Sequence, residues 1–296
     1  MRIAFATYRS SPVITDDDRL VVHALAAYGI DVVGIPWDAP ERWDAYSAVL
    51  PRSTWDFHHR LPEFQRWLAD LTASGVPTLN PTRLLEWNVT KHYLRSLEAQ
   101  GIDIVPTLWA AADAKHRIGL ADLMSRAAWT GDVVKPVVSA SAHDTWVARG
   151  CEPAQDERRF EASLSAATHG LMLQPFLPEV QAEGEWSVIF LGGQFSHAVL
   201  KRPAAGDFRV QESYGGSTVP RRPAAHVVEA AARAVQAAAD CTRLTPAEIL
   251  YARVDGVVRD GRFVLMEFEA VEPVLFLASA PAAASRMASL IQSALA

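Results

Sequence analysis

The sequence predicts a mixed α/β fold, with α+β character in parts, that is divided into three compact subdomains. Short apolar strands alternate with helical segments over the first eighty residues. From Gly131 the pattern changes to an apolar strand followed by a loop of small residues, and the final third holds strand pairs on either side of an Ala-rich helix. We expect the subdomains to span residues 1–83, 84–174 and 175–296.

The first subdomain should contain a small parallel sheet. Pro62 is typical of the first turn of a helix and Gly75 of a helix end, so a helix is predicted between them. Alternating strands and helices indicate parallel strands with helices on both faces. No GxGxxG motif follows the first strand, so a dinucleotide-binding fingerprint is absent. Strands are expected at 2–8, 30–37 and 47–53, and helices at 16–29 and 62–75.

The remaining chain should hold longer helices and antiparallel strand pairs. One helix is predicted over 84–101, ended by Gly101, and two strands should meet at Gly192-Gly193. Further strands are expected around Lys135, at 171–177 and on both sides of the Gly-Gly turn. Further helices are expected at 156–170, at 223–240 and at the C-terminus.

The composition excludes several classes of protein. The chain of 296 residues is half apolar and carries a net charge of −6, which disfavours nucleic acid or an anionic membrane as partners. No segment approaches the roughly 18 consecutive apolar residues of a membrane span. Cys151 and Cys241 lie far apart, so neither a disulfide framework nor a zinc site is indicated. We expect a cytoplasmic globular protein that acts on a small molecule, and a homo-oligomer stays open.

A charged strand pair, "ARVDGVVRDGRFVLMEFEAVEP" over 252–273, is the main candidate for chemistry. Carboxylates in otherwise apolar strands are costly to bury unless cations meet them. A two-residue Asp-Gly turn would place Asp255 on the face opposite to Glu267 and Glu269. A three-residue Arg-Asp-Gly loop would put these three and Arg253 on one face. We favour the three-residue loop, which leaves Glu272 out of step with that face and open as a substrate or capping contact.

Such a cluster is either a structural ion-pair network or a set of oxygen ligands for Mg²⁺. Mg²⁺ is usually held by a few carboxylates together with substrate phosphates. The metal interpretation therefore predicts phosphate-binding lysines elsewhere. Lys135 precedes a Ser/Ala loop with Ser139 and Ser141, whose backbone N–H groups can turn toward phosphate. Lys91, on the predicted helix, and Lys201, at a strand end, are the other candidates.

The order of these motifs resembles that of the ATP-grasp ligases, the superfamily of D-alanine–D-alanine ligase and bacterial glutathione synthetase. The resemblance implies a three-subdomain ATP-grasp fold with the nucleotide between the central and C-terminal domains. It implies ATP and two Mg²⁺ ions as cofactors, and a glutamate, Glu269, in place of the asparagine of the family's usual E-x-N motif. By this resemblance the metal ligands are Asp255, Glu267 and Glu269, and the nucleotide contacts are Lys91, Lys135, Ser139, Ser141, Gln174, Phe176, Leu177, Glu179, Glu185 and Lys201.

Several segments are similar to a branch of the superfamily that closes O-ureido-D-serine to D-cycloserine, among them "LPRSTWDFHHR" and "NPTRLLEWNVTKHYL". The resemblance implies an acyl-phosphate intermediate that is attacked by nitrogen, with an amino-acid-like substrate. An intermolecular amide ligase and a non-catalytic nucleotide-binding module remain alternatives. Arg253, Lys201 and Arg209 are the catalytic candidates, and the substrate candidates are Tyr8, Ser53, Thr54, Trp55, Asp56, Tyr214, Gly215 and Gly216, the last three in a loop over the γ-phosphate.

Overall fold

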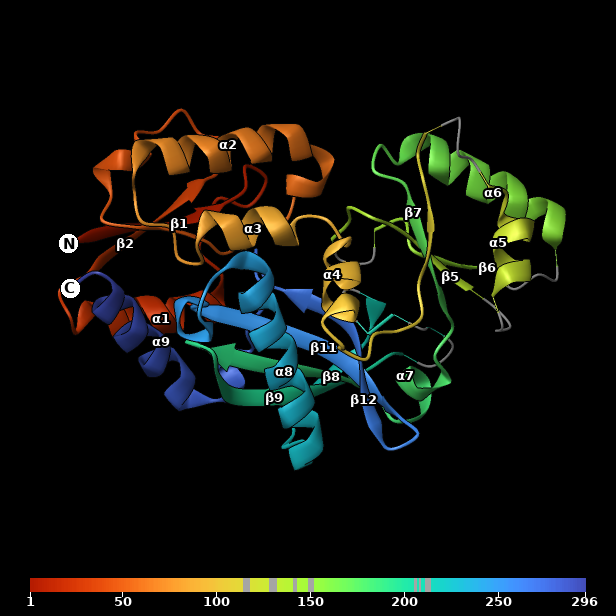
Figure 1. Ribbon diagram of the computed structural model, residues 1–296. Helices are drawn as coiled ribbons and strands as arrows, with labels where there is room; N and C mark the ends of the chain where they lie inside the picture. Colours follow the sequence, from red (N-terminus) through yellow and green to blue (C-terminus); the bar gives the residue numbers. More distant parts are fainter. Residues whose placement is uncertain are drawn as a thin grey trace.

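The computed structural model describes residues 1–113, 118–127, 132–140, 143–148, 152–204, 207, 209–210 and 214–296 (Figure 1). Within these residues the strands form three separate sheets of three, four and five strands. The mixed α/β class predicted from the sequence is thus confirmed.

The N-terminal sheet has the order β2-β1-β3 and is parallel throughout, as predicted. Alternate residues of β1 point to opposite faces, so Phe5 packs with Leu25 of α1 while Ala6 packs with Phe64 of α2. Helices therefore cover both faces of the sheet. Its elements are β1 (Arg2–Thr7), α1 (Asp16–Ala26), β2 (Asp31–Pro36), η1 (Trp43–Ala45), β3 (Val49–Pro51), η2 (Phe57–His59) and α2 (Leu61–Ser74).

The second sheet is antiparallel, in the order β4-β7-β5-β6. Phe160 and Leu164 of α6 and Leu123 of α5 pack against it, and Figure 1 shows these two helices side by side at one end of the molecule. The elements are β4 (Leu108–Ala110), α5 (Leu120–Arg126), β5 (Asp132–Pro136), β6 (Trp146–Ala148), α6 (Pro153–Ala166) and β7 (Leu171–Pro175).

The third sheet has the order β10-β9-β8-β11-β12 and is also antiparallel. The Ala-rich α8 covers one face of it, and α9 packs against both this sheet and α1. Gly192 and Gly193 have φ angles of 57° and 71° and join β8 to β9, as predicted. The elements are α7 (Pro178–Ala182), β8 (Glu185–Leu191), β9 (Gln194–Arg202), β10 (Ser217–Pro220), α8 (Ala225–Thr242), η5 (Pro246–Glu248), β11 (Tyr251–Arg259), β12 (Arg262–Glu269), η6 (Leu277–Ser279) and α9 (Pro281–Ala294).

The helix predicted over 84–101 is in fact two helices, α3 (Thr82–Asn88) and α4 (Tyr93–Ala99). The prediction that Lys91 lies on a helix is therefore wrong. Lys91 lies in the turn between them, and its backbone N–H donates to the Val137 carbonyl at 2.9 Å. A bond to another segment thus replaces a bond within a helix.

Both short helices pack against α8 of the third sheet region, and α4 also meets the second sheet, since Arg95 lies over the Trp109 ring of β4 at 4.5 Å. The division at 83 and 174 accordingly stays a prediction. None of the helices in the described ranges is long and apolar enough to cross a bilayer.

Candidate active site

The turn of the charged hairpin has two residues, not the three that we favoured. Arg259 pairs with Arg262, and between them Asp260 and Gly261 adopt left-handed φ angles of 51° and 74°. Positive φ at both central residues is what a two-residue hairpin turn with the right twist requires, and Asp-Gly is a preferred sequence for it. The three-residue loop is therefore wrong.

A β-bulge nevertheless brings the acidic residues to one face. Gly256 pairs with Leu265, but the next residue back, Asp255, pairs with Glu267, so Met266 is an extra residue on β12. Gly256 permits this close approach, because a Cβ there would overlap the Val264 carbonyl oxygen. A glycine inside an otherwise apolar strand is the sequence signal that could have indicated the bulge.

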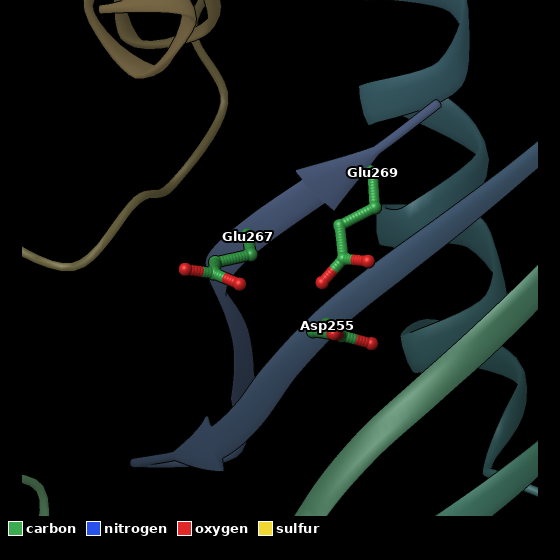
Figure 2. A group of neighbouring side chains, drawn as sticks. All are labelled: Asp255, Glu267 and Glu269. Atoms are coloured by element: carbon green, nitrogen blue, oxygen red, sulfur yellow. The ribbon is translucent and has the colours of Figure 1, made fainter. Parts of the chain in front are cut away.

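Asp255, Glu267 and Glu269 meet on this face of β11 and β12 (Figure 2). One carboxylate oxygen from each lies within 4.8 Å of the others, and no other group of this kind is found in the described parts of the chain. Asp255 is buried and the two glutamates are half-buried. Three carboxylates converging on one point fit the oxygen ligands that Mg²⁺ prefers.

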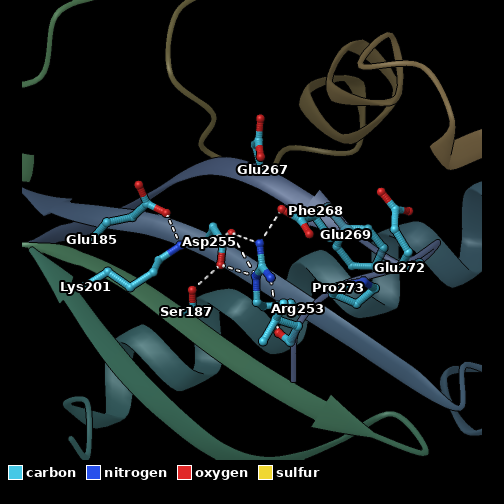
Figure 3. A network of polar contacts seen from close by, with 12 residues as sticks. Glu185, Ser187, Lys201, Arg253, Asp255, Glu267, Phe268, Glu269, Glu272 and Pro273 are labelled. Carbon is cyan, nitrogen blue, oxygen red and sulfur yellow. Dashed lines mark hydrogen bonds and ion pairs between the residues drawn. The ribbon is translucent and has the colours of Figure 1, made fainter. Parts of the chain in front are cut away.

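Two cations from the same sheet hold Asp255 (Figure 3). Lys201 Nζ lies 2.6 Å from a Glu185 carboxylate oxygen and 3.5 Å from Asp255 Oδ2. Arg253 Nε donates to both oxygens of Asp255, at 3.1 and 3.0 Å, and its Nη2 also contacts Glu269. Ser187 Oγ donates to Asp255 Oδ1 at 2.6 Å. The position of Asp255 is therefore fixed from three sides.

Lys91 reaches the cluster from the turn between α3 and α4. Its Nζ lies 2.7 Å from Glu267 Oε1. Burial raises the pKa of Glu267, but the charges of Lys91 and Lys135 outweigh it and hold that pKa at about 2. Burial lowers the pKa of Lys135, with a further contribution from the positive charge of Lys91 that is opposed by Glu267. The protonation of Glu267 thus depends on the charges of both lysines, and that of Lys135 depends on Glu267 and Lys91.

The three carboxylates differ in their proton affinity. Burial would raise the pKa of Asp255, but Arg253 and Lys201 lower it below its ordinary value. Burial raises the pKa of Glu269 to about 7, with the charges of Asp255 and Glu267 adding to the effect and Arg253 opposing it. Such an accumulation of acids is stabilised by an added cation.

Side chains complete the hydrogen bonding of the outer edge of β12, where the sheet has no further strand. Phe268 N–H donates to Tyr93 Oη at 3.1 Å and Ala270 N–H to Asn88 Oδ1 at 2.8 Å. Asn88 Nδ2 donates to the Phe268 carbonyl at 2.8 Å, and Asn80 Nδ2 to the Ala270 carbonyl at 2.9 Å. The segment that carries Lys91 therefore also holds the strand that carries Glu267 and Glu269.

The cluster opens into a cavity of about 740 Å³ lined by residues of all three sheet regions. Apolar side chains such as Val133 and Val210 line it along with the charged groups. The predicted site residues that line it are Trp55, Lys91, Lys135, Ser139, Gln174, Phe176, Leu177, Glu185, Lys201, Arg209, Arg253, Asp255, Glu267 and Glu269.

Other predicted residues lie outside this lining: Tyr8, Ser53, Thr54, Asp56, Glu179, Tyr214, Gly215 and Gly216. Asp56 accepts hydrogen bonds from Trp37 Nε1 and Arg60 Nη2, both at 2.8 Å, which is a structural role. Glu179 lies 3.4 Å from Arg259 Nε. The guanidinium of Arg209 lies over the ring of Tyr214, with Arg209 Cζ 3.6 Å from the ring centroid. Ser141 falls outside the described residues.

Sequence reasoning missed several lining residues. Asn88 and Tyr93 line the cavity as well as holding β12, and Asp17 and Phe276 lie at its wall. Glu272, which the sequence left as a possible substrate or capping contact off the cluster face, also lines the cavity; β12 ends at Glu269, so strand alternation does not place it. Polar residues among the apolar positions of a predicted helix were the available signal for Asn88.

The comparisons with known proteins agree with this geometry. Residues 3–80 match the family model described as the N-terminal domain of the D-cycloserine synthetase DcsG. The cycloserine biosynthesis protein DcsG of Streptomyces lavendulae is 29% identical over 203 residues, which are 67% of each chain. A crystal structure of D-cycloserine synthetase DcsG is 25% identical with a TM-score of 0.88 over 100% of both chains. The D-alanine–D-alanine ligase of Bacillus anthracis is 16% identical with a TM-score of 0.69 over 99% of this chain and 96% of the other.

The chain is thus similar in fold to the ATP-grasp ligases, enzymes of the ADP-forming carbon–nitrogen class, and its three converging carboxylates fit that similarity. Within that class, the match over residues 3–80 and the similarity to DcsG support the D-cycloserine synthetase branch. The superfamily and branch expected from the order of the motifs are therefore confirmed.

Proposed function

We propose that the protein closes O-ureido-D-serine to D-cycloserine with hydrolysis of ATP to ADP and phosphate. The observation that carries the proposal is the shared cavity, in which three lysines and three carboxylates meet next to a wall formed by the N-terminal subdomain. The part of the chain that matches the DcsG N-terminal domain supplies that wall through Trp55.

ATP would lie between the second and third sheets. Lys91, Lys135 and Lys201 would contact its phosphates, because all three amines line the cavity beside the carboxylate cluster. The adenine would meet the backbone of the segment containing Gln174 and Leu177. Solved structures with a similar fold include a D-alanine–D-alanine ligase complexed with ATP and the ATP-grasp ligase PsnB complexed with Mg and ADP.

Asp255, Glu267 and Glu269 would hold Mg²⁺, and we propose two ions. Their converging oxygens and their mutual repulsion fit a divalent cation. When bound, Mg²⁺ would offset charge on the phosphate oxygens. Lys91 would then be released from Glu267 to contact phosphate.

The chemistry would proceed in two steps. A carboxylate oxygen of the substrate forms a bond to the γ-phosphorus while ADP leaves. The oxygen-bound nitrogen of the same molecule then attacks the carbonyl carbon of the acyl-phosphate, and phosphate leaves with that carboxylate oxygen. Arg253, fixed by Asp255 and the Val274 carbonyl, would stabilise the negative charge on the attacked carbonyl. The nitrogen loses its proton as the ring closes, and one water molecule then cleaves its bond to the carbamoyl group, which leaves as carbamic acid. One substrate, one ATP and one water thus give D-cycloserine, carbamic acid, ADP and phosphate.

ADP release over a panel of substrates tests the proposal. O-ureido-D-serine alone should give ADP and D-cycloserine in equal amounts at a rate independent of any added amine. An intermolecular ligase would release ADP only when a second, amine-bearing molecule is added. ATP binding without ADP release over the whole panel would indicate a nucleotide-binding module. Either of these two results would overturn the cyclisation.

A further inference from the structure

The strap at 272–274, which follows β12, is held in place by three donors from elsewhere in the chain. Trp55 Nε1 donates to the Glu272 carbonyl, Arg52 Nη2 to the Pro273 carbonyl and Arg253 Nη1 to the Val274 carbonyl, each at 3.1 Å. Arg52 is itself buried and paired with Asp18 at 2.9 Å. Three successive carbonyls fixed in this way give the Glu272 side chain a defined direction.

That direction is into the cavity. Glu272 lines it, and in Figure 3 its carboxylate points to the same side as that of Glu267. Unlike the carboxylate of Asp255, the carboxylate of Glu272 makes no hydrogen bond or ion pair with the part of the chain that the structure describes. The residue is half-buried at the cavity wall, so its carboxylate stays accessible to a ligand that enters the cavity. An unpaired carboxylate facing a cavity is suited to pair with a cationic group of that ligand.

Glu272 is separate from the metal cluster. The group of oxygens that converge on one point contains Asp255, Glu267 and Glu269 but not Glu272. Its neighbours in the cavity lining include Trp55 and Phe276, and the exposed Val274 follows it. The end of the cavity near Glu272 therefore combines one unpaired carboxyl group with aromatic and apolar walls. This suits a small organic cation better than a second hydrated ion.

We propose that the Glu272 carboxylate binds the α-ammonium group of the amino-acid substrate. The assignment rests on the proposed function, in which the carboxylate of the substrate is activated beside Glu267 and Glu269. The ammonium and the carboxylate of an α-amino acid share one carbon atom, so the ammonium acceptor must lie next to the metal cluster. Glu272 follows Glu269 by three residues and meets that requirement.

The electrostatics of the cavity are consistent with this role. Burial and the charge of Glu269 raise the pKa of Glu272 to about 8. A bound ammonium group would favour the ionised carboxylate through the same Coulomb attraction that lowers the pKa of paired acids. The amine is not the nucleophile in the ring closure, so its charge can stay paired throughout the reaction.

The test compares a substrate that has the amine with one that lacks it. O-ureido-D-serine and its des-amino analogue, 3-(ureidooxy)propanoate, differ only in that group. Binding of each to the enzyme with Mg²⁺ and ADP is measured by calorimetry, and turnover is measured by ADP release. The wild type should prefer the amine-bearing compound, and Glu272→Gln should raise the KM of O-ureido-D-serine by roughly 10–100-fold while leaving that of the analogue within about twofold.

Further variants separate binding from structure. Glu272→Asp, which keeps the charge, should recover part of the preference, and Glu229→Gln on the exposed side of α8 is the matched control. Equal losses for both compounds in Glu272→Gln, or an increased Mg²⁺ requirement, would overturn the assignment. So would a wild type with no preference for the amine. If the wild type binds O-ureido-D-serine with that preference but does not turn it over, the cyclisation fails and the ammonium site stands.

Discussion

Asp255 lies directly opposite Glu267 in the β11–β12 ladder, although the turn that joins the strands would put them on opposite faces. The extra residue Met266 in the bulge restores the alignment, and Gly256 leaves room for it. The convergence of the three carboxylates therefore depends on Gly256, a residue that has no side chain to contribute to the cluster.

Replacing Gly256 with alanine should damage the site and the fold together. The added Cβ would overlap the Val264 carbonyl oxygen and lie 2.6 Å from Phe263 Cζ. We expect a loss of about 1–3 kcal/mol in the free energy of unfolding and a loss of ADP-forming activity. Gly101→Ala is the comparison: nothing lies within 4 Å of its Cβ, but its positive φ strains an alanine, so it should lose stability and keep ADP-forming activity. Denaturant titration checks both variants, and an unaltered Gly256→Ala protein would contradict the role of the bulge.

Glu267→Gln should weaken Mg²⁺ binding while leaving the fold intact. The amide keeps the size of the side chain but removes the charge that Lys91 contacts at 2.7 Å. The Mg²⁺ concentration for half-maximal ADP release should rise at least about tenfold. Glu248→Gln, on a half-exposed glutamate outside the cavity, should leave it unchanged. The same Mg²⁺ dependence in both variants would argue against the metal site.

Lys91→Ala and Lys135→Ala should each weaken nucleotide binding. Both amines line the cavity, and a charge-assisted contact to phosphate contributes about 1.5–3 kcal/mol, or roughly 10–100-fold in affinity. Direct binding of Mg²⁺-ATP by calorimetry measures the effect. Arg83→Ala, at an exposed ion pair with Glu248, is the control. Unchanged affinity in both lysine variants would refute their assignment.

Asn88→Ala should lower both stability and activity, although Asn88 is not one of the proposed phosphate or metal contacts. Its side chain satisfies the Ala270 N–H and the Phe268 carbonyl at the edge of β12. Leaving these groups unpaired should cost about 1–3 kcal/mol of stability. Asn88→Asp keeps the acceptor and should recover part of the kcat. A stability loss without any change in kcat or in the KM for Mg²⁺-ATP would limit Asn88 to a structural role.

Stability should depend on pH through His58. Burial, together with the charges of His59 and His143, lowers the pKa of His58 to about 4, against about 6.5 in the unfolded chain. Between these values the unfolded state binds more protons, so the free energy of unfolding rises with pH and is constant above about 6.5. Because His58 is partly exposed, we expect a contribution of about 1–2 kcal/mol. His58→Gln should flatten the denaturation curve against pH in this window, and an unchanged slope would contradict the assignment.

The sequence was sufficient to predict the parallel N-terminal sheet and the residues that form the acidic cluster. Periodicity revealed the sheet, and charge in apolar strands revealed Asp255 and Glu267. The sequence was not sufficient to predict the turn, because a two-residue and a three-residue loop are both acceptable locally. Only the β-bulge lets the two-residue turn bring the acidic residues to one face, and the bulge was not predicted.

Tertiary contacts explain the other differences. Helical periodicity runs continuously through Lys91, but the bond from its N–H to Val137 ends the helix. The partners of Asp56, such as Trp37, are distant in the sequence, so its structural role was not visible. Glu272 was placed by strand alternation, which ends with the strand itself at Glu269.

The fate of a labelled oxygen tests the central claim most directly. O-ureido-D-serine carrying ¹⁸O in its carboxylate is incubated with the enzyme, Mg²⁺ and ATP, and the phosphate is analysed by mass spectrometry. If the carboxylate is activated as an acyl-phosphate, each phosphate released should contain one carboxylate oxygen, in step with ADP and D-cycloserine. Release of ADP with unlabelled phosphate, or formation of the ring without ADP, would contradict the account.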